Sequence, residues 1–392
     1  MALINCDFFS ETLGMSSSMT VILPQQTVGQ IGMKGSDGEE VIKQALLHHA
    51  QIQSPQRAKE FLEHLEPIQE KIHFITVQGI MGEQILKNFP FSYEYLQDSR
   101  IQNTKLFQTT AQHTVWAAQL MKVIPVDLLV FIGGDGTARD ICKSVDLEIP
   151  CLGIPGGVKI HSSVFAVNPE KAAELVLKYL NNEIPLREAE VLDIDEEEFR
   201  HNRVVSRLYG YLKVPYSPTL SQPSKMASPH TEEEFANQAS IAEWILMEWE
   251  NTYPDWYYLL GPGTTTRAIA QKIKQPKTLL GVDLYYRQKI VAKDLNEEEL
   301  IAQTKDRNVK LVVTPIGAQG FVFGRGNLQL SPKVLEQIGL KNVQIIATKF
   351  KVSTLPQGKL RIDSRDKEFD KKFRGLHRVL VDFGEYNIIR VE

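Results

Sequence analysis

The feature that most constrains the fold is a short apolar run that ends directly in a glycine-rich turn. Residues 126–132 are apolar except for Asp127. The turn that follows consists of Gly133, Gly134, Asp135, Gly136 and Thr137, and a helix-like stretch at 138–145 comes next. A buried strand that enters a helix through glycines is typical of parallel sheets whose helices cover both faces. This junction therefore predicts an α/β fold.

The same strand-to-glycine pattern occurs three more times. A run at 150–154 leads to Gly156 and Gly157, a run at 256–260 leads through 261–266 into a helix at 267–273, and a run at 309–314 leads to a turn with Gly317 and Gly320. Alternating strands and helices in the first part predict a doubly wound, Rossmann-like parallel sheet with right-handed crossovers. Short strand-like runs crowd the C-terminal region, at 343–348, 360–362, 379–383 and 387–391, and predict a β-rich second domain.

Several helices and loops follow from local signals. Helices are expected at 39–49, 54–65, 110–121, 172–180 and 235–249, with Ser54 as N-cap and Pro55 as first helical residue. The last of these helices should bury Ile241, Ile245 and either Leu246 or Met247. The acidic run at 193–198 is expected to be a solvated loop. The Pro- and Ser-rich stretch at 215–231 is expected to be an exposed loop, with a mobile lid as the alternative.

Composition excludes several classes of protein. The chain has 392 residues, 43% of them hydrophobic, which suits two domains, and no apolar run approaches the about 20 residues that span a bilayer. A net charge of -4 gives no broad attraction for nucleic acid or anionic lipid. Residues 1–24 lack the pattern of a secretory signal, so we expect a cytoplasmic location. Cys6, Cys142 and Cys151 lack metal-ligand spacing, and we expect them to be reduced and mostly buried.

The GGDGT turn is the strongest candidate site. Glycines let backbone N–H groups approach phosphate oxygens, and the positive end of the following helix dipole points the same way. Asp135 is unexpected there, because phosphates repel a carboxylate unless it takes a proton from an attacking hydroxyl or holds a metal ion. The alternative is that Asp135 caps the helix. From the turn alone, the two interpretations are evenly balanced.

Other turns offer similar chemistry. Gly261, Pro262, Gly263, Thr264, Thr265 and Thr266 form a second turn with three hydroxyls at a helix start, although a plain threonine-capped turn explains it as well. Lys159 and His161, after Gly156 and Gly157, are candidates for phosphate contacts, but such residues are more often partly exposed loop side chains. Residues 34–39 form a third, weaker glycine cradle. No GxxxxGK[ST] loop, protein-kinase motif set or GxSxG elbow is present.

Longer stretches of the chain resemble a known family. GGDGT resembles the signature of the superfamily of NAD kinases, diacylglycerol kinases and phosphofructokinases. Four further segments are similar to the ATP-NAD kinase-like branch that includes AcoX proteins, over roughly residues 34–392: PCLGIPGGVKIHSSVFAVNPEKAAEL from Pro150, YYLLGPGTTTRAI from Tyr257, TLLGVDL from Thr278 and TPIGAQGFVFGRGNLQLSP from Thr314.

The resemblance implies domains, an activity and a site. It implies a Rossmann-like N-terminal domain at 34–168, a β-rich domain at 169–392 and an active site in the cleft between them. It also implies a kinase that uses ATP and Mg²⁺ to phosphorylate NAD or a related nucleotide-like hydroxyl compound, with Asp135 as base or orienting residue. The implied nucleotide-binding residues are Gly133, Gly134, Gly136, Thr137, Gly156, Gly157, Gly261, Gly263, Thr264, Thr265 and Thr266. No metal ligand is assigned, and relatives of this kind are usually homo-oligomers.

The chain also departs from the family pattern. Its segment Gly153-Ile154-Pro155-Gly156-Gly157 replaces a Gly-x-Asn-x-Gly motif, and Asn296-Glu297 lies in a different context from the ribose-binding Asn-Glu pair of NAD kinases. Residues 1–33 resemble instead the start of small tributyrin esterases, without a downstream triad, although residues 19–23 are still expected to supply a strand to the first sheet. A nucleotide-binding regulator without turnover is therefore the main alternative, and an esterase remnant a minor one.

Overall fold

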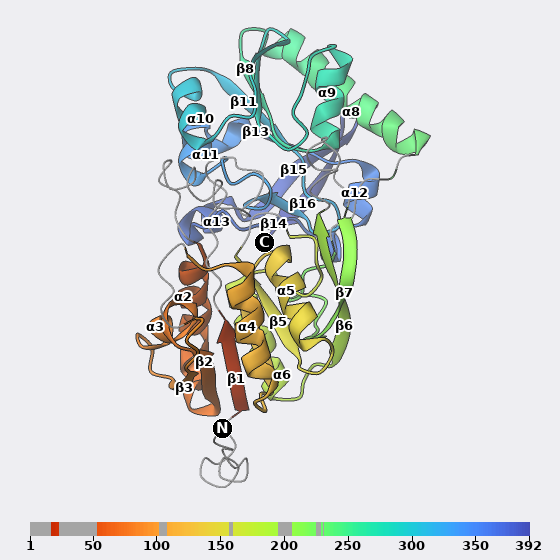
Figure 1. Ribbon diagram of the computed structural model, residues 1–392. Coiled ribbons are helices and arrows are strands. Elements are labelled where there is room, and N and C mark those ends of the chain that lie inside the picture. The colour runs from red at the N-terminus through yellow and green to blue at the C-terminus, as the bar shows by residue number, and fades with distance from the viewer. Residues whose placement is uncertain are drawn as a thin grey trace.

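Two large sheets, each with helices on both faces, and two smaller two-stranded sheets form the part of the chain that the structure describes. The computed structural model describes residues 17–22, 53–101, 108–156, 160–194, 206–224, 229 and 231–392. The N-terminal sheet lies below the C-terminal sheet in Figure 1. The expected mixed α/β architecture, with a sheet-rich C-terminal part, is confirmed.

The first sheet has five parallel strands in the order β3-β2-β1-β4-β5. Its strands are β1 (Ser17–Ile22), β2 (Ile72–Val77), β3 (Ser92–Leu96), β4 (Leu128–Gly133) and β5 (Cys151–Pro155). Strand β1 pairs with β2 on one side and β4 on the other, so the atypical N-terminal segment supplies the central strand, where a strand at 19–23 was expected. This strand order is that of a doubly wound fold.

Alternating side chains of β4 explain why both faces of this sheet are covered. Leu128, Val130 and Ile132 belong to the core cluster with helices α2 (Gln53–Leu65) and α6 (Pro169–Leu180). Leu129 and Phe131 belong to the cluster with α4 (Ala111–Lys122) and α5 (Asp135–Val145). A strand that is buried on both faces reads as one continuous apolar run, as this one does. The short elements η2 (Glu66–Lys71), η3 (Gly79–Met81) and α3 (Glu83–Leu86) connect β2 to its neighbours.

Residues 169–215 pack with the first sheet, whereas the sequence analysis placed the end of the first domain at residue 168. Helix α6 packs against α2 in the first core, through buried residues such as Ala172 and Val176. The antiparallel hairpin of β6 (Leu186–Ile194) and β7 (Ser206–Pro215) packs its apolar side, including Val191 and Leu212, on α5. The first sheet and its helices cover the apolar faces of these elements, so this segment belongs with the N-terminal layer.

The second sheet is mixed and has seven strands in the order β10-β9-β8-β11-β13-β15-β16. The middle strands β8, β11, β13 and β15 are parallel, and antiparallel strands lie at both edges. Its strands are β8 (Tyr257–Leu260), β9 (Asp283–Tyr286), β10 (Lys289–Ala292), β11 (Val309–Val313), β13 (Val343–Ile346), β15 (Gly375–Asp382) and β16 (Glu385–Val391). A separate parallel pair joins β12 (Phe321–Phe323) to β14 (Arg361–Ile362).

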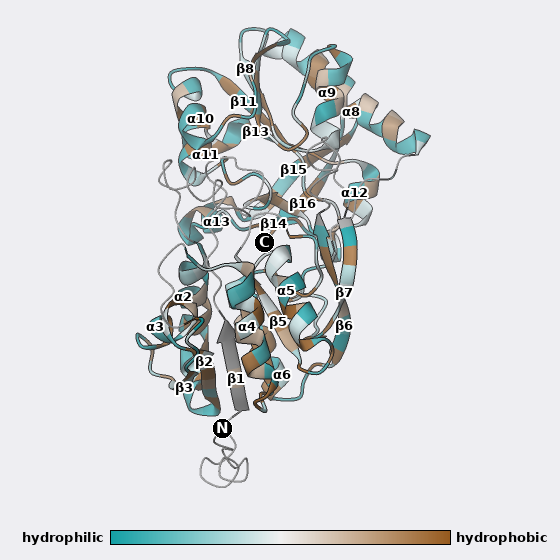
Figure 2. Ribbon diagram, viewed as in Figure 1, coloured by the Kyte–Doolittle hydropathy of each residue, from teal (hydrophilic) through white to brown (hydrophobic). Residues whose placement is uncertain are grey.

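Helices cover both faces of the second sheet as well. One face carries α8 (Glu232–Thr252) and α9 (Thr264–Lys272), and the other carries α10 (Glu297–Thr304), α11 (Pro332–Ile338) and α13 (Lys367–Phe373). The remaining short elements are η4 (Leu340–Asn342), α12 (Lys349–Ser353) and η5 (Pro356–Gly358). Hydrophobic residues lie along strands such as β2 and β5 in Figure 2, whereas hydrophilic residues lie mostly on the helices and loops.

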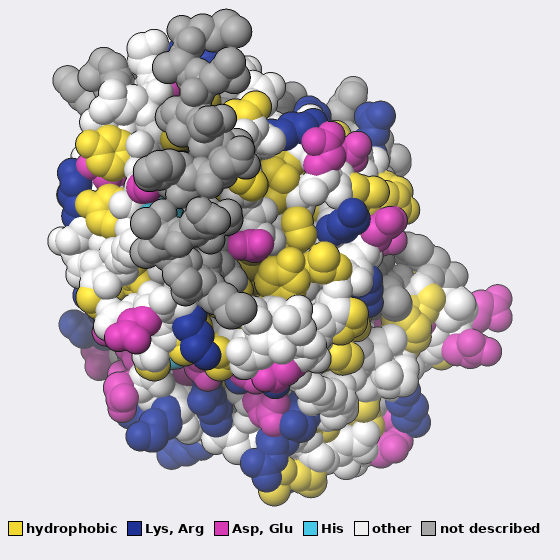
Figure 3. Space-filling view, turned by 90° about the horizontal axis from the view of Figure 1, so that it is seen from below, with side chains coloured by type: hydrophobic (Ala, Val, Ile, Leu, Met, Phe, Trp, Pro, Cys, Tyr) yellow, Lys and Arg dark blue, Asp and Glu magenta, His cyan; other side chains and the backbone are white. Residues whose placement is uncertain are grey.

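The surface shows mixed charge on the face that is visible in Figure 3, where basic and acidic side chains are interspersed. None of the described helices is both long enough and apolar enough to span a bilayer. Cys142 is partly buried, Cys151 is buried and both are free thiols, as expected, whereas Cys6 lies outside the described residues.

Two local sequence predictions differ from the structure, and three others lie outside the described residues. Helix α2 begins at Gln53, so Ser54 lies inside its first turn and is not the N-cap that the sequence predicted. Residues 220–222 are buried, and Ser221 forms a β-bridge with Ala166, so this part of the expected exposed loop is packed into the protein. The predicted helix at 39–49, the cradle at 34–39 and residues 195–198 of the acidic run lie outside the described residues.

Helix α8 resolves the alternative that its periodicity left open. Ile241 and Ile245 are fully buried as predicted, Leu246 is partly buried against the same cluster, and Met247 is exposed. The exposed side of the helix therefore passes through Met247.

We expect Ile245→Ala to lower the free energy of unfolding by about 2–5 kcal/mol, because the truncation leaves a cavity in the cluster under α8. Met247→Ala, two residues away on the exposed side, should change it by less than about 0.5 kcal/mol. Urea unfolding followed by circular dichroism measures both. Equal losses in the two variants would contradict this orientation of the helix.

Candidate functional site

The GGDGT turn lies at the point where the strand order of the first sheet reverses. From β1 the chain continues to β2 on one side, whereas β4 continues to β5 on the other side. Ligands of doubly wound folds bind in the crevice that opens at the carboxyl ends of such neighbouring strands. Gly133 is the last residue of β4, and Asp135 is the first residue of α5. The turn therefore stands where this topology places a ligand.

Gly133 is required by close packing within the turn. A Cβ atom at this position would lie 2.3 Å from Thr137 Oγ1, because the first turn of α5 folds back over the end of β4. This contact explains one glycine of the motif without a ligand. The N-cap of α5 is Gly134, and no side chain bonds to the helix start there. The first amides of α5 are thus not capped by a side chain.

Asp135 is held by the loop after β5 and does not cap its own helix. Its Oδ2 accepts a hydrogen bond from the His161 N–H at 2.7 Å, and its Oδ1 accepts one from the Ser162 N–H at 3.0 Å. The Ser162 hydroxyl lies 2.6 Å from Oδ1. The capping interpretation is wrong, because these partners lie 26 and 27 residues away in the chain.

The electrostatics of Asp135 are unusual for a carboxyl group. Asp135 is only 6% exposed to solvent. Burial raises the pKa of Asp135 to about 7, against the opposing effect of the hydrogen bonds from Ser162 and His161. Asp193, which pairs with Arg139 at 2.7 Å, raises this pKa further. A carboxyl group with a pKa near neutrality can both accept and release a proton, which is what a general base requires.

In the second glycine turn, at the carboxyl end of β8, the three threonine hydroxyls differ in burial and hydrogen bonding. Thr266 Oγ1 lies 2.6 Å from the Gly261 carbonyl oxygen and 2.9 Å from that of Gly263, so it ties the turn together. Thr264 is exposed, whereas Thr265 is fully buried and its hydroxyl has no hydrogen-bond partner. Thr266 therefore has the structural role that a plain threonine-capped turn predicts. The Thr265 hydroxyl is the one that remains able to form a hydrogen bond.

The carboxyl ends of the parallel strands in the two sheets face each other. Gln319, in the loop after β11, donates from Nε2 to the Ile160 carbonyl oxygen in the loop after β5, at 2.8 Å. In the same group of loops, buried Lys351 donates from Nζ to Thr314 Oγ1 at 2.8 Å. The Asp135 loop and the loops of the second sheet thus meet at one junction.

The remaining candidates from the sequence differ in their burial and in whether the structure describes them. His161 is buried, so the expectation of a partly exposed loop side chain is wrong, while Gly157 and Lys159 lie outside the described residues. A Cβ atom on Gly156 would lie 3.3 Å from both the Gly133 nitrogen and Ser54 Oγ. Ser54 therefore lies beside the candidate site, and its buried hydroxyl has no hydrogen-bond partner. The sequence analysis had predicted Ser54 only as a helix cap.

Two further features bear on the chemistry. Asn296 caps α10 in a capping box with Glu299, which gives Asn296 a structural role, and Glu297 is the first residue of that helix. Among the described residues, no group of three or more His, Cys, Asp or Glu side chains is placed to hold a metal ion.

Comparisons with protein families give two matches. Residues 42–184 match the ATP-NAD kinase N-terminal domain, and residues 268–391 match the ATP-NAD kinase C-terminal domain. Together the matches cover more than half of the chain. They do not distinguish an AcoX-like branch, and the esterase-like residues 1–33 lie outside both. None of the curated proteins that were compared matches the chain.

Solved structures give weaker likenesses. A putative diacylglycerol kinase from Bacillus anthracis str. Sterne is 15% identical, over 45% of this chain and 44% of that chain, with a TM-score of 0.22. A second diacylglycerol kinase structure from the same organism is 14% identical, over 45% of each chain, with a TM-score of 0.21. A UDP-N-acetylglucosamine 2-epimerase is 9% identical, over 89% of this chain and 84% of that one, with a TM-score of 0.22. The match spans less than half of either diacylglycerol kinase.

The raised pKa of Asp135 predicts a pH dependence of stability. In the folded protein Asp135 stays protonated up to about pH 7, whereas the unfolded chain releases this proton near its ordinary value of 3.8. The folded state therefore binds the proton more tightly between these values, and the contribution to stability falls as the pH rises through this window. Relative to Asp135→Asn, the wild-type protein should lose up to roughly 4 kcal/mol between the two ends.

Urea unfolding at a series of pH values between 4 and 8 measures this difference. The same substitution at exposed Asp127 is the control for the chemical change itself. Parallel stability curves for the wild-type protein and Asp135→Asn would show that Asp135 titrates like an ordinary surface carboxyl.

Proposed function

This chain belongs to the ATP-NAD kinase family, and from that membership we propose that it transfers the γ-phosphoryl group of ATP to a hydroxyl group of NAD or of a related nucleotide-like acceptor. With NAD as acceptor, the product would be NADP. Asp135 is the proposed base that takes the proton of the acceptor hydroxyl, whose oxygen then bonds to the γ-phosphorus as ADP leaves.

One observation carries this proposal: a buried carboxyl with a pKa near 7 stands at the carboxyl end of β4, beside the start of a helix. Its neighbours hold it in place through three hydrogen bonds of 2.6 to 3.0 Å. Each carboxylate oxygen has two lone pairs, and among the described residues Oδ2 accepts only one hydrogen bond, from the His161 N–H. The remaining lone pair of Oδ2 is the one we assign to the acceptor hydroxyl.

Backbone groups would stabilise the transferred phosphoryl group. The proposed nucleotide-binding residues of the first sheet are Gly133, Gly134, Gly136, Thr137, Gly156 and Gly157. The first turn of α5 presents N–H groups and the positive end of the helix dipole, which favour phosphate oxygens. Such preorganised donors need no rearrangement while charge develops in phosphoryl transfer.

The second sheet would hold the rest of the nucleotide from the opposite side. The proposed residues there are Gly261, Gly263, Thr264, Thr265 and Thr266. The unpartnered hydroxyl of Thr265 lies in the first turn of α9, where a phosphate or ribose oxygen would satisfy it. Thr266 would act indirectly, because its hydroxyl fixes the shape of the turn.

Mg²⁺ is the proposed metal cofactor. Among the described residues, no cluster of carboxylates is placed to hold a metal ion. We propose that Mg²⁺ would enter with ATP, held by phosphate oxygens and water. Bound in this way, it would neutralise phosphate charge. We also propose a cytoplasmic location and, as the family resemblance implies, a homo-oligomer.

A regulator that binds nucleotide without turnover is the second candidate. It is favoured by the way Asp135 is engaged, because both of its oxygens already accept hydrogen bonds within the protein. An aspartate whose main task is to anchor the 160–163 loop would show the same contacts. The two candidates differ in whether Asp135 meets a substrate hydroxyl.

We expect the purified protein to form NADP from ATP, Mg²⁺ and NAD, measured with a coupled NADP-specific dehydrogenase. Asp135→Asn should lower kcat by at least about 100-fold, the usual share of a general base. Nucleotide binding by both proteins, measured by calorimetry, should remain. Binding without product across NAD and a panel of nucleoside acceptors would favour the regulator and contradict the kinase.

A second prediction concerns the pH profile of that reaction. Ser162→Ala removes a hydroxyl that stabilises the ionised form of Asp135, so the pKa of Asp135 should rise further. The acidic limb of kcat/KM should therefore move upward by about one pH unit.

Ser163→Ala is the matched control, because the Ser163 hydroxyl bonds to the backbone of Glu190 and not to Asp135. Its acidic limb should coincide with that of the wild-type enzyme. An unshifted limb in Ser162→Ala would show that Asp135 is not the group that this limb reports.

A further inference from the structure

One hydroxyl ties Asp135 to strand β6 of the neighbouring hairpin. The Ser162 oxygen lies 2.6 Å from Asp135 Oδ1, and it also lies 2.8 Å from the carbonyl oxygen and 2.9 Å from the nitrogen of Leu192 on β6. Asp193 is the next residue of that strand. The backbone of Asp193 is therefore held at a fixed position beside the carboxyl group of Asp135.

Arg139 connects Asp193 back to the helix that carries Asp135. Arg139 Nη1 donates to Asp193 Oδ2 at 2.7 Å. Arg139 lies four residues after Asp135 on α5, and residues at this spacing share one side of a helix. The side chains of Arg139 and Asp193 are 24% and 17% exposed, so water and salt screen this ion pair only in part. Asp135, Ser162, Asp193 and Arg139 thus form a closed ring of neighbours, the Asp135 ring.

The two charged members of the Asp135 ring act on Asp135 in opposite directions. Burial is the main cause of the raised pKa of Asp135, and the negative charge of Asp193 raises it further. The guanidinium group of Arg139 places a positive charge beside the Asp193 carboxylate, so it counters the field that Asp193 exerts on its surroundings. Arg139 therefore limits how strongly Asp193 disfavours the ionised form of Asp135.

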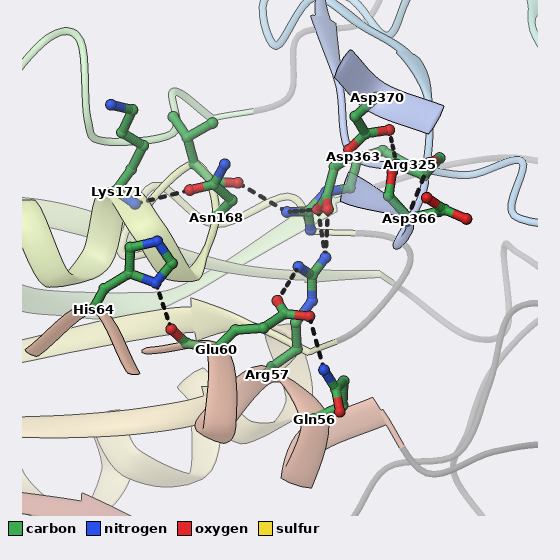
Figure 4. A network of polar contacts seen from close by, with 12 residues as sticks. Gln56, Arg57, Glu60, His64, Asn168, Lys171, Arg325, Asp363, Asp366 and Asp370 are labelled. Atoms are coloured by element: carbon green, nitrogen blue, oxygen red, sulfur yellow. Dashed lines mark hydrogen bonds and ion pairs between the residues drawn. The ribbon is translucent and has the colours of Figure 1, made fainter. Parts of the chain in front are cut away.

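Asp363, in the loop after β14, shows what guanidinium groups do when they contact a buried carboxyl group directly. Arg57 Nη2 lies 2.6 Å from both of its oxygens, and Arg325 Nη2 lies 3.1 Å from Oδ2. Figure 4 shows Arg57 and Arg325 pointing toward Asp363 from different elements. Burial would raise the pKa of Asp363, but Arg57, Arg365 and Arg325 hold it at about 2.

This contrast explains why an indirect guanidinium suits Asp135. A carboxyl group with a pKa of about 2 is a poor proton acceptor at neutral pH. Arg139 is bonded to Asp193, so it reduces a neighbouring negative charge without pairing with Asp135 in the way that Arg57 pairs with Asp363. The arrangement leaves Asp135 with a pKa near neutrality.

Other charged and titratable groups lie on the elements that pack around Asp135. Asp140 Oδ1 lies 3.5 Å from Arg139 Nε, and Arg207 faces Asp193 across the hairpin register. Further groups on these elements are His161 in the loop that holds Asp135, Glu190 on β6, Tyr209 and Tyr211 on β7, His113 and Lys122 on α4, and Lys351 in the second layer. All of these groups stay the same in variants that differ only at position 139 or 193, so such variants isolate the contribution of the Asp135 ring.

We propose that Arg139 is a positioning residue for Asp135, which holds Asp193 in place and counters its charge so that Asp135 can ionise near neutral pH. Arg139 contacts no substrate in this role and acts through Asp193. The inference rests on the proposed function, because a base must be ionised before it accepts the proton of the acceptor hydroxyl. The electrostatic link itself needs no turnover, so it can also be measured apart from catalysis.

The first test is the pH dependence of kcat/KM for NADP formation from ATP, Mg²⁺ and NAD, whose acidic limb reports ionisation of the base in the free enzyme. Arg139→Gln should move this limb upward and Asp193→Asn should move it downward, each by about half a pH unit or more. Arg139→Lys keeps the positive charge, so its limb should lie closer to that of the wild-type enzyme than the limb of Arg139→Gln does.

Lys143→Gln is the matched control for the loss of one positive charge. Lys143 is an exposed residue in the last turn of α5, two helical turns away from Asp135, and it is not part of the Asp135 ring. Its acidic limb should coincide with that of the wild-type enzyme.

The second test follows urea unfolding between pH 4 and 9 in the same variants, each with and without Asp135→Asn. The stability that Asp135 contributes is present at low pH and is lost as the pH rises through its raised pKa in the folded protein. This loss should continue to a higher pH in Arg139→Gln and end at a lower pH in Asp193→Asn.

The outcomes separate this inference from the proposed function. Opposite shifts of the unfolding curves without NADP formation would support the role of Arg139 and contradict the kinase. Coincident curves for the wild-type protein, Arg139→Gln and Asp193→Asn would overturn the proposal. Shifts of both variants in the same direction would overturn it as well, because loss of a merely structural ion pair disturbs the site in the same way whichever partner is removed.

Discussion

The parallel pairing of β1 with β4 is the constraint on which the candidate site depends. Parallel strands end at the same edge of a sheet, so the loops after β4 and β5 lie together, and the reversal of strand order leaves a crevice beside them. The middle strands of the second sheet are parallel as well, and their loops reach the same junction through Gln319. Two sheets that present their carboxyl edges to each other concentrate backbone donors in one place.

Asp135 and Asp363 show how environment sets the character of the same side chain. Both are buried at the junction between the two layers, but neutral backbone amides and a hydroxyl surround Asp135, whereas guanidinium groups surround Asp363. The pKa of the first is therefore raised to about 7 and that of the second is held at about 2. One carboxyl group is suited to exchanging a proton, and the other to fixing positive charge.

Local patterns predicted the elements better than they predicted the contacts between them. The apolar run and glycines around residue 133 were enough to place β4 and α5, because the helix must fold back over a strand end without a Cβ atom. The partners of Asp135 could not be read from the sequence, since His161 and Ser162 come from a loop beyond the next strand. The boundary after residue 168 failed for a related reason: α6 and the β6–β7 hairpin have ordinary amphipathic patterns, and only packing shows which sheet covers them.

The position of Ser162 has a consequence for how Asp135 changes its charge. The Ser162 oxygen lies 2.6 Å from Asp135 Oδ1 and 2.8 Å from the Leu192 carbonyl oxygen, and it also accepts from the Leu192 N–H at 2.9 Å. A hydroxyl has a single hydrogen, so it can serve only one of the two acceptors at a time. When the carboxylate is ionised, this hydrogen points toward Asp135; once the carboxyl is protonated, the hydroxyl is released to rotate toward strand β6. A change of charge at Asp135 therefore redirects the Ser162 O–H bond between Asp135 and strand β6 of the neighbouring hairpin.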